Sequence, residues 1–157
     1  VKSRLKSEKS IKNKLAKKGV KYTYKNAAKY VSDILGIRIV VSFISDVYDI
    51  VTELNKSKLM IVKERRDYIK EPKKSGYTSY HLKVLVPITL DGLEEYIPAE
   101  IQIRTVAMDF WASLDHKLKY KKDNLKHPEI IAQELKKCAD MSTAMDYKMQ
   151  EIRNMLE

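Results

Sequence analysis

Residues 96–104 of the chain are Tyr-Ile-Pro-Ala-Glu-Ile-Gln-Ile-Arg, in which apolar and polar side chains alternate strictly. A period of two residues is typical of a β-strand with one face on a hydrophobic core. The second face then presents a carboxylate, an amide and a guanidinium about 7 Å apart along the strand: Glu100, Gln102 and Arg104. An ordinary solvent-facing strand surface explains the same alternation, so the pattern alone leaves both interpretations open.

The segments around this strand predict a sheet combined with helices. Runs rich in β-branched residues predict further strands, and an Asp-Gly pair predicts a hairpin turn before the alternating strand. The strands are expected at 36–43, 59–69, 79–88 and 94–104, with the turn at Asp91-Gly92. Helical spacing of apolar residues predicts helices at 8–18, 24–31 and 45–56, and from Val106 onward with a break near His127-Pro128. This order predicts an α/β or α+β domain.

The net charge of +10 is concentrated at one end of the chain. Residues 1–30 hold eleven Lys or Arg and a single acidic residue, Glu8, whereas the remaining residues hold 20 basic and 20 acidic side chains. A local basic block attracts polyanions such as nucleotide phosphates, RNA or an anionic membrane surface. A solvated helix face has the same composition, so charge alone does not choose between these interpretations.

The composition also excludes several classes of protein. No apolar run approaches the roughly 20 residues that a membrane-spanning helix needs, so no membrane partner is expected. The single cysteine, Cys138, excludes an internal disulfide, is expected to be a buried thiol on a helix, and favours a cytoplasmic location. The chain has no Gly-rich phosphate loop of the P-loop or Rossmann type and no zinc spacing.

Two carboxylates are candidate metal ligands. Asp33 stands just before the predicted strand at 36–43, and Glu100 lies on the polar face of the alternating strand. If the sheet brings them together, their oxygens suit Mg²⁺, which would neutralise charge on phosphate oxygens. A turn or helix-capping role explains an aspartate at this position equally well.

The loop after the predicted strand at 59–69 concentrates basic and aromatic residues. Lys70, Lys73, Lys74 and His81 share it with Tyr77 and Tyr80. Cations suit phosphates and an aromatic ring suits a base, so the loop is a candidate nucleotide site. A polar surface loop with packed tyrosines is the alternative.

Four motifs, in order, resemble the synthetase domain of the RelA/SpoT family. They are Asp33-Ile-Leu-Gly-Ile-Arg-Ile39, Arg66-Asp-Tyr-Ile-Lys-Glu-Pro-Lys73, Ser75-Gly-Tyr-Thr-Ser-Tyr-His81 and Ala99-Glu-Ile-Gln-Ile-Arg-Thr105. The short chain is similar to a small alarmone synthetase. The resemblance implies a nucleotidyltransferase-like fold with about five strands, a catalytic domain at 1–122, and a helical segment at 123–157 that belongs to the same domain and assembles a homotetramer.

The resemblance also implies an activity. Such an enzyme is a GTP pyrophosphokinase of the stringent response, which transfers pyrophosphate from ATP to the 3′-hydroxyl of GTP or GDP with Mg²⁺ and releases AMP. It implies these roles: Asp33 and Glu100 for catalysis and metal binding, Arg4 and Arg38 for ATP, and Tyr77, Lys73, His81, Gln102, Arg104 and Arg66 for the acceptor. Asp109 stands where some relatives have Asn near the guanine.

Two other functions remain as alternatives at this point. A non-catalytic basic module that binds RNA or nucleotides would explain the charge, although no RNA-recognition fingerprint is present. A general nucleotidyltransferase would use the same two carboxylates but would release pyrophosphate rather than AMP.

Overall fold

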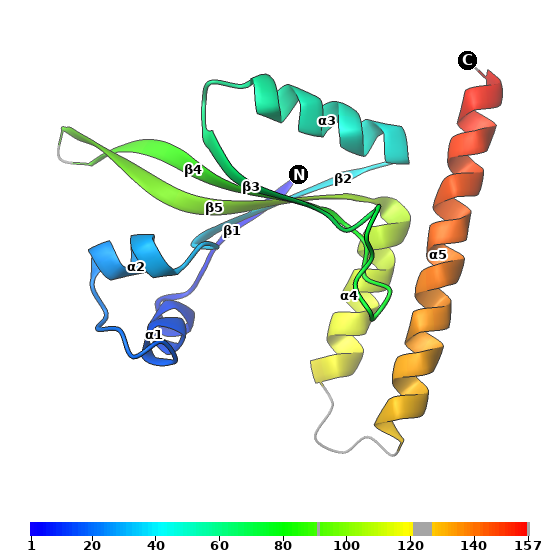
Figure 1. Ribbon diagram of the computed structural model, residues 1–157, viewed down its shortest axis with the longest axis horizontal. Coiled ribbons are helices and arrows are strands. Elements are labelled where there is room, and N and C mark those ends of the chain that lie inside the picture. Colours follow the sequence, from blue (N-terminus) through cyan, green and yellow to red (C-terminus); the bar gives the residue numbers. More distant parts are fainter. Residues whose placement is uncertain (91, 121–126, 157) are drawn as a thin grey trace. The chain divides into compact units, whose positions relative to one another are not determined.

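The computed structural model describes residues 1–90, 92–120 and 127–156, and it contains a five-stranded sheet and five helices in that part of the chain (Figure 1). The strands are β1 Lys2–Leu5, β2 Leu35–Val41, β3 Ile61–Asp67, β4 Tyr80–Leu90 and β5 Leu93–Thr105. The helices are α1 Glu8–Ala16, α2 Tyr24–Tyr30, α3 Ile44–Lys56, α4 Val106–Tyr120 and α5 Pro128–Leu156.

The sheet confirms the predicted α+β class. Its strand order is β1-β2-β5-β4-β3, so the alternating strand β5 is central. The apolar face of β5 is buried as expected, because Ala99, Ile101 and Ile103 are at most 2% exposed. At one edge, β1 pairs antiparallel with β2, and Arg4 lies opposite Gly36 in this register.

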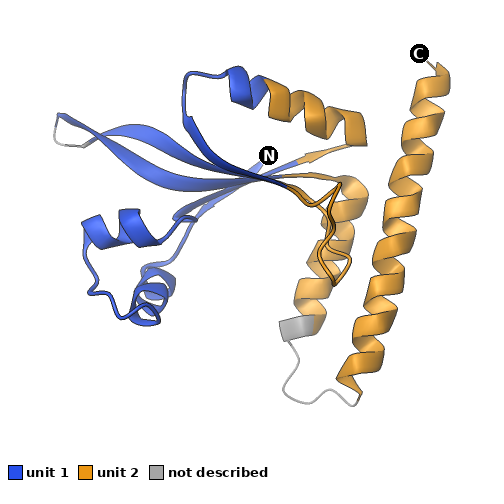
Figure 2. Ribbon diagram, viewed as in Figure 1, with its two compact units in different colours: residues 1–39, 53–66, 81–102 blue, residues 40–52, 67–80, 103–157 orange. Residues whose placement is uncertain are grey.

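The chain forms two compact units, which are described separately (Figure 2). Unit 1 comprises residues 1–39, 53–66 and 81–102, and unit 2 comprises residues 40–52, 67–80 and 103–157. The chain passes between the units within β2, α3, β3, β4 and β5, so β5 supplies Glu100 and Gln102 to unit 1 and Arg104 to unit 2.

Helices α1 and α2 of unit 1 pack on a small core of their own. Leu15, Ala27 and Val31 form this core and are at most 7% exposed. Ser7 caps α1 by accepting a hydrogen bond from the amide of Ser10, and Thr23 caps α2 in the same way. Because the apolar residues face inward, the lysines of both helices lie on the outside.

In unit 2, α4 and α5 run side by side (Figure 1). The indole nitrogen of Trp111 on α4 donates to the Leu135 carbonyl on α5 at 2.9 Å. Near its other end, α5 binds the start of α3 through an ion pair between Arg153 and Asp46. Helix α5 is therefore fixed at both ends within this unit.

Two expectations from the sequence were wrong or incomplete. Strand β1 was not anticipated, because its four residues are all exposed and show no apolar alternation. Cys138 is exposed rather than buried. An apolar stripe of α5 that includes Met141, Met145 and Met149 faces outward, whereas the buried residues of this helix are the small Ala139 and the polar Asp146. The turn residue Asp91 and the predicted boundary between 122 and 123 lie outside the described residues.

Candidate active site

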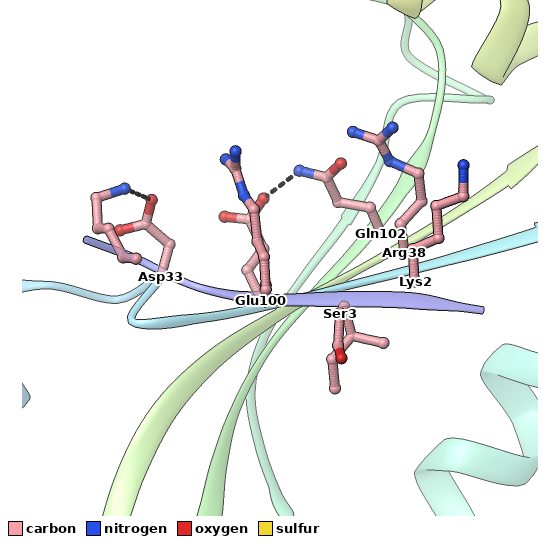
Figure 3. A pocket seen from close by; sticks show the side chains of 10 residues that line it. Lys2, Ser3, Asp33, Arg38, Glu100 and Gln102 are labelled. Carbon is pink, nitrogen blue, oxygen red and sulfur yellow. Dashed lines mark hydrogen bonds and ion pairs between the residues drawn. The ribbon is translucent and has the colours of Figure 1, made fainter. Parts of the chain in front are cut away.

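A cavity of about 370 Å³ opens in unit 1 beside β1, β2 and β5. It is lined by Lys2, Ser3, Arg4, Lys6, Asp33, Gly36, Ile37, Arg38, Glu100 and Gln102. Five of these residues were predicted to be functional from the sequence. In Figure 3, the side chains of Lys2, Arg38, Glu100 and Gln102 project from the same side of the strands, whereas Ser3 points to the opposite side. The cavity therefore gathers both predicted carboxylates and both predicted ATP-binding arginines.

Asp33 is bound by two lysines. Its Oδ2 lies 2.7 Å from Lys6 Nζ, and its Oδ1 lies 2.8 Å from Lys14 Nζ. Burial raises the pKa of Asp33, but the hydrogen bonds and charges of Lys14 and Lys6 outweigh burial and hold this pKa below its ordinary value. The carboxylate is therefore charged at neutral pH. The sequence analysis did not single out Lys6 or Lys14, whose only signal was the excess of lysine in residues 1–30.

Glu100 is held from two neighbouring positions on the sheet. The amide nitrogen of Gln102 donates to Glu100 Oε1 at 2.7 Å, and His81 Nδ1 lies 3.4 Å from the same oxygen. All three side chains are partly buried. Gln102 and His81, predicted to serve the acceptor, thus contact the predicted catalytic base directly and fix the orientation of its carboxylate.

Arg66 belongs to an ion cluster on β3 and β4. Glu64 pairs with Arg66 through one carboxylate oxygen, and its other oxygen lies 2.6 Å from Lys83 Nζ. The hydrogen bonds from Lys83 and then Arg66 lower the pKa of Glu64 below its ordinary value. The sequence analysis missed both Glu64 and Lys83, because a charged pair on neighbouring strands becomes visible only when the strand pairing is known.

Unit 2 holds a second cluster, centred on Arg104 and Tyr77. The guanidinium of Arg104 donates to the Tyr77 hydroxyl at 2.6 Å and to Asp109 Oδ1 at 3.1 Å. Lys73 Nζ lies 4.8 Å from the centre of the Tyr77 ring. Arg104 was expected on an open strand face, but its side chain is only 5% exposed. The cluster therefore presents a half-buried aromatic ring with two cations and a carboxylate around it.

The backbone of the loop at 67–78 explains how Tyr77 is presented. Asp67 Oδ1 accepts hydrogen bonds from the amides of Ile69 and Lys70, both at 3.0 Å, which forms a turn at the start of the loop. Farther along, the amide of Gly76 donates to the Lys73 carbonyl at 2.8 Å. Gly76 has a φ of +85°, a conformation that favours glycine. These bonds close the loop and bring Lys73 close to Tyr77.

The donor atoms of the cavity fit a magnesium ion. Within the described part of the chain, no group of three or more His, Cys, Asp or Glu side chains is placed to hold a metal by itself. Mg²⁺ usually binds through one or two carboxylates together with substrate phosphates and water. Asp33 and Glu100 line one cavity, and their carboxylates have the hard oxygen donors that such a shared site would need.

The cavity has the chemistry of a nucleotide-dependent phosphotransferase. Cationic walls suit a polyphosphate, and paired carboxylates suit the divalent metal that accompanies it. Residues 3–125 match the sequence model described as "Region found in RelA / SpoT proteins". The chain therefore belongs to the RelA/SpoT family.

Individual relatives agree with this assignment. GTP pyrophosphokinase YwaC of Bacillus subtilis is 47% identical over 148 residues, which are 94% of this chain and 70% of that protein. The crystal structure of small alarmone synthetase 2 from Bacillus subtilis matches with a TM-score of 0.87 and 45% identity, covering 98% of this chain and 79% of that one. Small alarmone synthetase 1 from the same organism, bound to its product pppGpp, matches with a TM-score of 0.87 and 36% identity, covering 99% and 78%.

The described part of the chain contains no helix that is long and apolar enough to cross a membrane.

Proposed function

We infer that this protein is a (p)ppGpp synthetase, which transfers pyrophosphate from ATP to the 3′-hydroxyl of GTP or GDP and releases AMP. The observation that carries this inference is the cavity of unit 1, where Asp33 and Glu100 lie together with Arg4 and Arg38. Membership of the RelA/SpoT family and similarity to named GTP pyrophosphokinases support the same reaction.

The cavity is the proposed site for ATP. Arg4 comes from the edge strand β1 and Arg38 from its neighbour β2, and their planar guanidinium groups are suited to stack on adenine. Lys6 and Lys14, now paired with Asp33, are close enough to this carboxylate to bind the triphosphate when a divalent metal takes their place on Asp33. The ion pairs of the two lysines with Asp33 would thereby be replaced by pairs of the lysines with phosphate and of Asp33 with the metal.

The Tyr77–Arg104 cluster is the proposed site for the guanine of the acceptor. The Tyr77 ring offers a stacking surface, and Lys73 supplies a positive charge beside it. Guanine presents two adjacent N–H donors on its base-pairing edge, and the Asp109 carboxylate is an acceptor for such donors. His81 and Arg66 are proposed to bind acceptor phosphates, as the family resemblance implies.

In the proposed reaction, Glu100 acts as the general base and also as a ligand of the metal. The acceptor 3′-oxygen forms a bond to the β-phosphorus of ATP, the bond from that phosphorus to the α–β bridging oxygen breaks, and AMP leaves with that oxygen. Glu100 accepts the hydroxyl proton, and Gln102 and His81 keep its carboxylate oriented through Oε1. Asp33 and Glu100 would hold Mg²⁺, which neutralises charge on the phosphate oxygens when it is bound.

The test is a transfer assay with ATP labelled on its terminal phosphate, Mg²⁺ and either GDP or GTP. The parent protein is expected to give a labelled guanosine tetra- or pentaphosphate with one AMP for each product. Glu100→Gln should lower kcat by about 10²- to 10⁴-fold, because it removes the base. Glu94→Gln is the matched control, since Glu94 lies on the same strand but is exposed and bound only to Tyr96 in the described contacts.

Two results would reject the proposed function. Folded protein that forms no AMP and no labelled guanosine product with either acceptor would leave the non-catalytic binding module as the better reading. Release of pyrophosphate instead of AMP would identify a general nucleotidyltransferase.

A single-stranded nucleic acid is a second proposed partner, because of the surface of α1 and α2. Tyr22, Tyr24 and Tyr30 are at least 36% exposed, and Lys12 Nζ lies 4.9 Å from the centre of the Tyr22 ring. Exposed rings among cations suit unstacked bases and their phosphates. Fluorescence anisotropy with labelled single-stranded RNA should show affinity that falls steeply with salt and falls further in Tyr22→Ala. No binding at low salt would reject this partner.

The helical segment at 123–157 is proposed to assemble a homotetramer, and the cytoplasm, where ATP and GTP are available, is the proposed location. The outward apolar side chains of α5 support self-association, because large exposed apolar patches usually mark interaction surfaces.

A further inference from the structure

Helix α5 contacts the residue that immediately precedes Tyr77. A Cβ atom added to Gly76 would lie only 2.4 Å from Ala139 Cβ and 3.0 Å from Lys136 Cδ, both on α5. Gly76 and Ala139 are both buried, and Ala139 is only 2% exposed. The loop that carries Tyr77 therefore rests directly on α5, at a point where neither partner has space for a larger side chain.

The same helix binds the residue that immediately follows Arg104. The Thr105 hydroxyl donates to Asp146 Oδ2 at 2.6 Å, and the same hydroxyl oxygen accepts from the Met108 amide at 3.2 Å. Thr105 is fully buried, and Asp146 is 6% exposed. The junction between β5 and α4 is therefore fastened to α5 by a buried hydrogen bond.

These two contacts are made by one face of α5. Ala139 and Asp146 are seven residues apart, which is two helical turns and about 10 Å along the axis. They hold the neighbours of Tyr77 and Arg104, and these two residues are hydrogen-bonded to each other. Sequence reasoning found no role for either Ala139 or Asp146, because neither carries a recognisable motif.

We propose that Ala139 and Asp146 are positioning residues for the acceptor nucleotide, and that α5 sets the geometry of the Tyr77–Arg104 pair. This proposal rests on the proposed function, because it takes that pair as the guanine site. A displacement of α5 would shift Gly76 and Thr105, and hence the ring and the guanidinium. Binding of GDP or GTP should therefore depend on these two contacts, whereas binding of ATP to the cavity of unit 1 should not.

The first test adds a methyl group at the loop contact and then makes room for it. Gly76→Ala is expected to raise the KM for GDP roughly tenfold, with the KM for ATP unchanged, because the new Cβ pushes the loop off α5. Adding Ala139→Gly removes the obstructing Cβ and should restore most of the lost affinity. Rescue by a second substitution on another element would not occur if Gly76→Ala acted only through its own backbone.

Two control variants separate the contact from backbone and helix effects. Gly92 also has a positive φ, +78°, but a Cβ there would meet no atom within 4 Å, so Gly92→Ala measures backbone strain alone. Ala144 is exposed on α5, so Ala144→Gly measures the loss of helix propensity alone. Neither control should change the KM for GDP by more than about twofold.

The second test concerns Asp146. Asp146→Ala removes the acceptor for the Thr105 hydroxyl and should raise the KM for GDP severalfold. Asp146→Asn keeps an oxygen that can accept this hydrogen bond, so its KM for GDP should be close to that of the parent protein. GDP and ATP affinities are measured directly by calorimetry beside the kinetics, on variants that unfold cooperatively. A change in both affinities alike, or no rescue in either pair, would overturn the proposal. A parent protein that binds ATP but neither GDP nor GTP would instead reject the proposed function.

Discussion

Arg104 donates a partly buried hydrogen bond to Tyr77, with Nη2 of the arginine 2.6 Å from the tyrosine hydroxyl. The guanidinium carbon also lies 5.2 Å from the centre of the Tyr77 ring. The Arg104 side chain is only 5% exposed, so water could not readily replace the Tyr77 hydroxyl as the acceptor for its guanidinium. Loss of this hydrogen bond would therefore be costly, and the bond holds the Tyr77 ring in place. The candidate stacking surface for guanine is thus held in place before any nucleotide binds.

Substitutions of Tyr77 should separate this bond from stacking. Tyr77→Phe keeps the ring but leaves the guanidinium short of one acceptor, which should lower the free energy of unfolding by about 1–3 kcal/mol. Tyr77→Ala also removes the stacking surface, worth about 1–3 kcal/mol per base, and should raise the KM for GDP or GTP by roughly 5- to 150-fold. Steady-state kinetics with each substrate varied in turn checks this. The KM for ATP should stay the same.

Tyr96→Phe provides the control. The Tyr96 hydroxyl takes part in a hydrogen bond too, as the donor to the Glu94 carboxylate, but both residues are exposed on β5. Removing it should change stability by no more than about 0.5 kcal/mol and leave both KM values unaltered. A Tyr77→Ala variant that binds the acceptor as well as this control would show that guanine does not use the ring.

The order of strands and helices, apart from β1, was predictable from the sequence, because side-chain periodicity reports burial directly. The alternation at 96–104 gave β5, and its buried face, with Ala99 and Ile103 fully enclosed, is as expected. The ordered motifs contain Asp33, Arg38 and Glu100, and the family resemblance implied Arg4 as well; the structure brings all four residues into one cavity. Asp33, Arg38 and Glu100 were recognisable because they stand in motifs that resemble the family in both order and spacing.

Contacts between segments distant in the sequence were not predictable. The pairing of Lys14 with Asp33 needs the placement of α1, and the pairing of Lys83 with Glu64 needs two strands aligned. Helix α5 shows the limit most clearly. Cys138 was expected to be buried but is exposed, because the helix packs through the face that carries Ala139, which Gly76 approaches closely.

Lys14 should contribute to ATP binding. Its Nζ lies 2.8 Å from Asp33, which lines the cavity proposed for the triphosphate, so Lys14→Ala removes a cation beside that cavity. The expected result is a rise of about 5- to 20-fold in the KM for ATP, in the range of one charge-assisted hydrogen bond. The KM for GDP should stay constant. Titration with ATP at saturating GDP measures the effect.

Lys9→Ala is the control for Lys14→Ala. Lys9 lies on the same helix and carries the same charge, but in the described contacts only Lys14 of these two pairs with Asp33. Equal effects of the two substitutions would mean that α1 acts only through its overall charge, and the assignment of Lys14 to the triphosphate would fail.

Asp146 should make stability depend on pH. Burial raises the pKa of Asp146, and the hydrogen bond from Thr105 only partly opposes this. The folded protein then binds more protons than the unfolded chain between the ordinary and the raised pKa, so the contribution of Asp146 to stability falls as pH rises through that window. Asp146→Asn should therefore raise the Tm at pH 7, and this advantage should shrink as the pH falls toward about 4.

Asp140→Asn is the comparison for this pH series. Asp140 is exposed on α5 and pairs with Lys136, so its removal should leave the Tm at pH 7 unchanged or slightly lower. A Tm difference for Asp146→Asn that stays constant from pH 4 to pH 7 would show that ionisation of Asp146 does not limit stability.

The outward face of α5 should govern the oligomeric state. Met141, Met145 and Met149 are 73%, 55% and 47% exposed, although they form one apolar stripe on a helix that is already fixed to unit 2 by its other face. A second copy of the chain is a suitable cover, because methionine side chains adapt to a matching surface.

Sedimentation equilibrium at micromolar concentration should show an oligomer for the parent protein. The double variant Met145→Lys/Met149→Lys should sediment near 18.3 kDa, because two buried, unpaired charges would oppose association. Gln133→Lys adds the same charge at an exposed position of α5 that lies about a third of a turn around the helix from Met145, and it should keep the parent's mass. A parent protein that is monomeric at this concentration would remove the basis for assigning 123–157 to assembly.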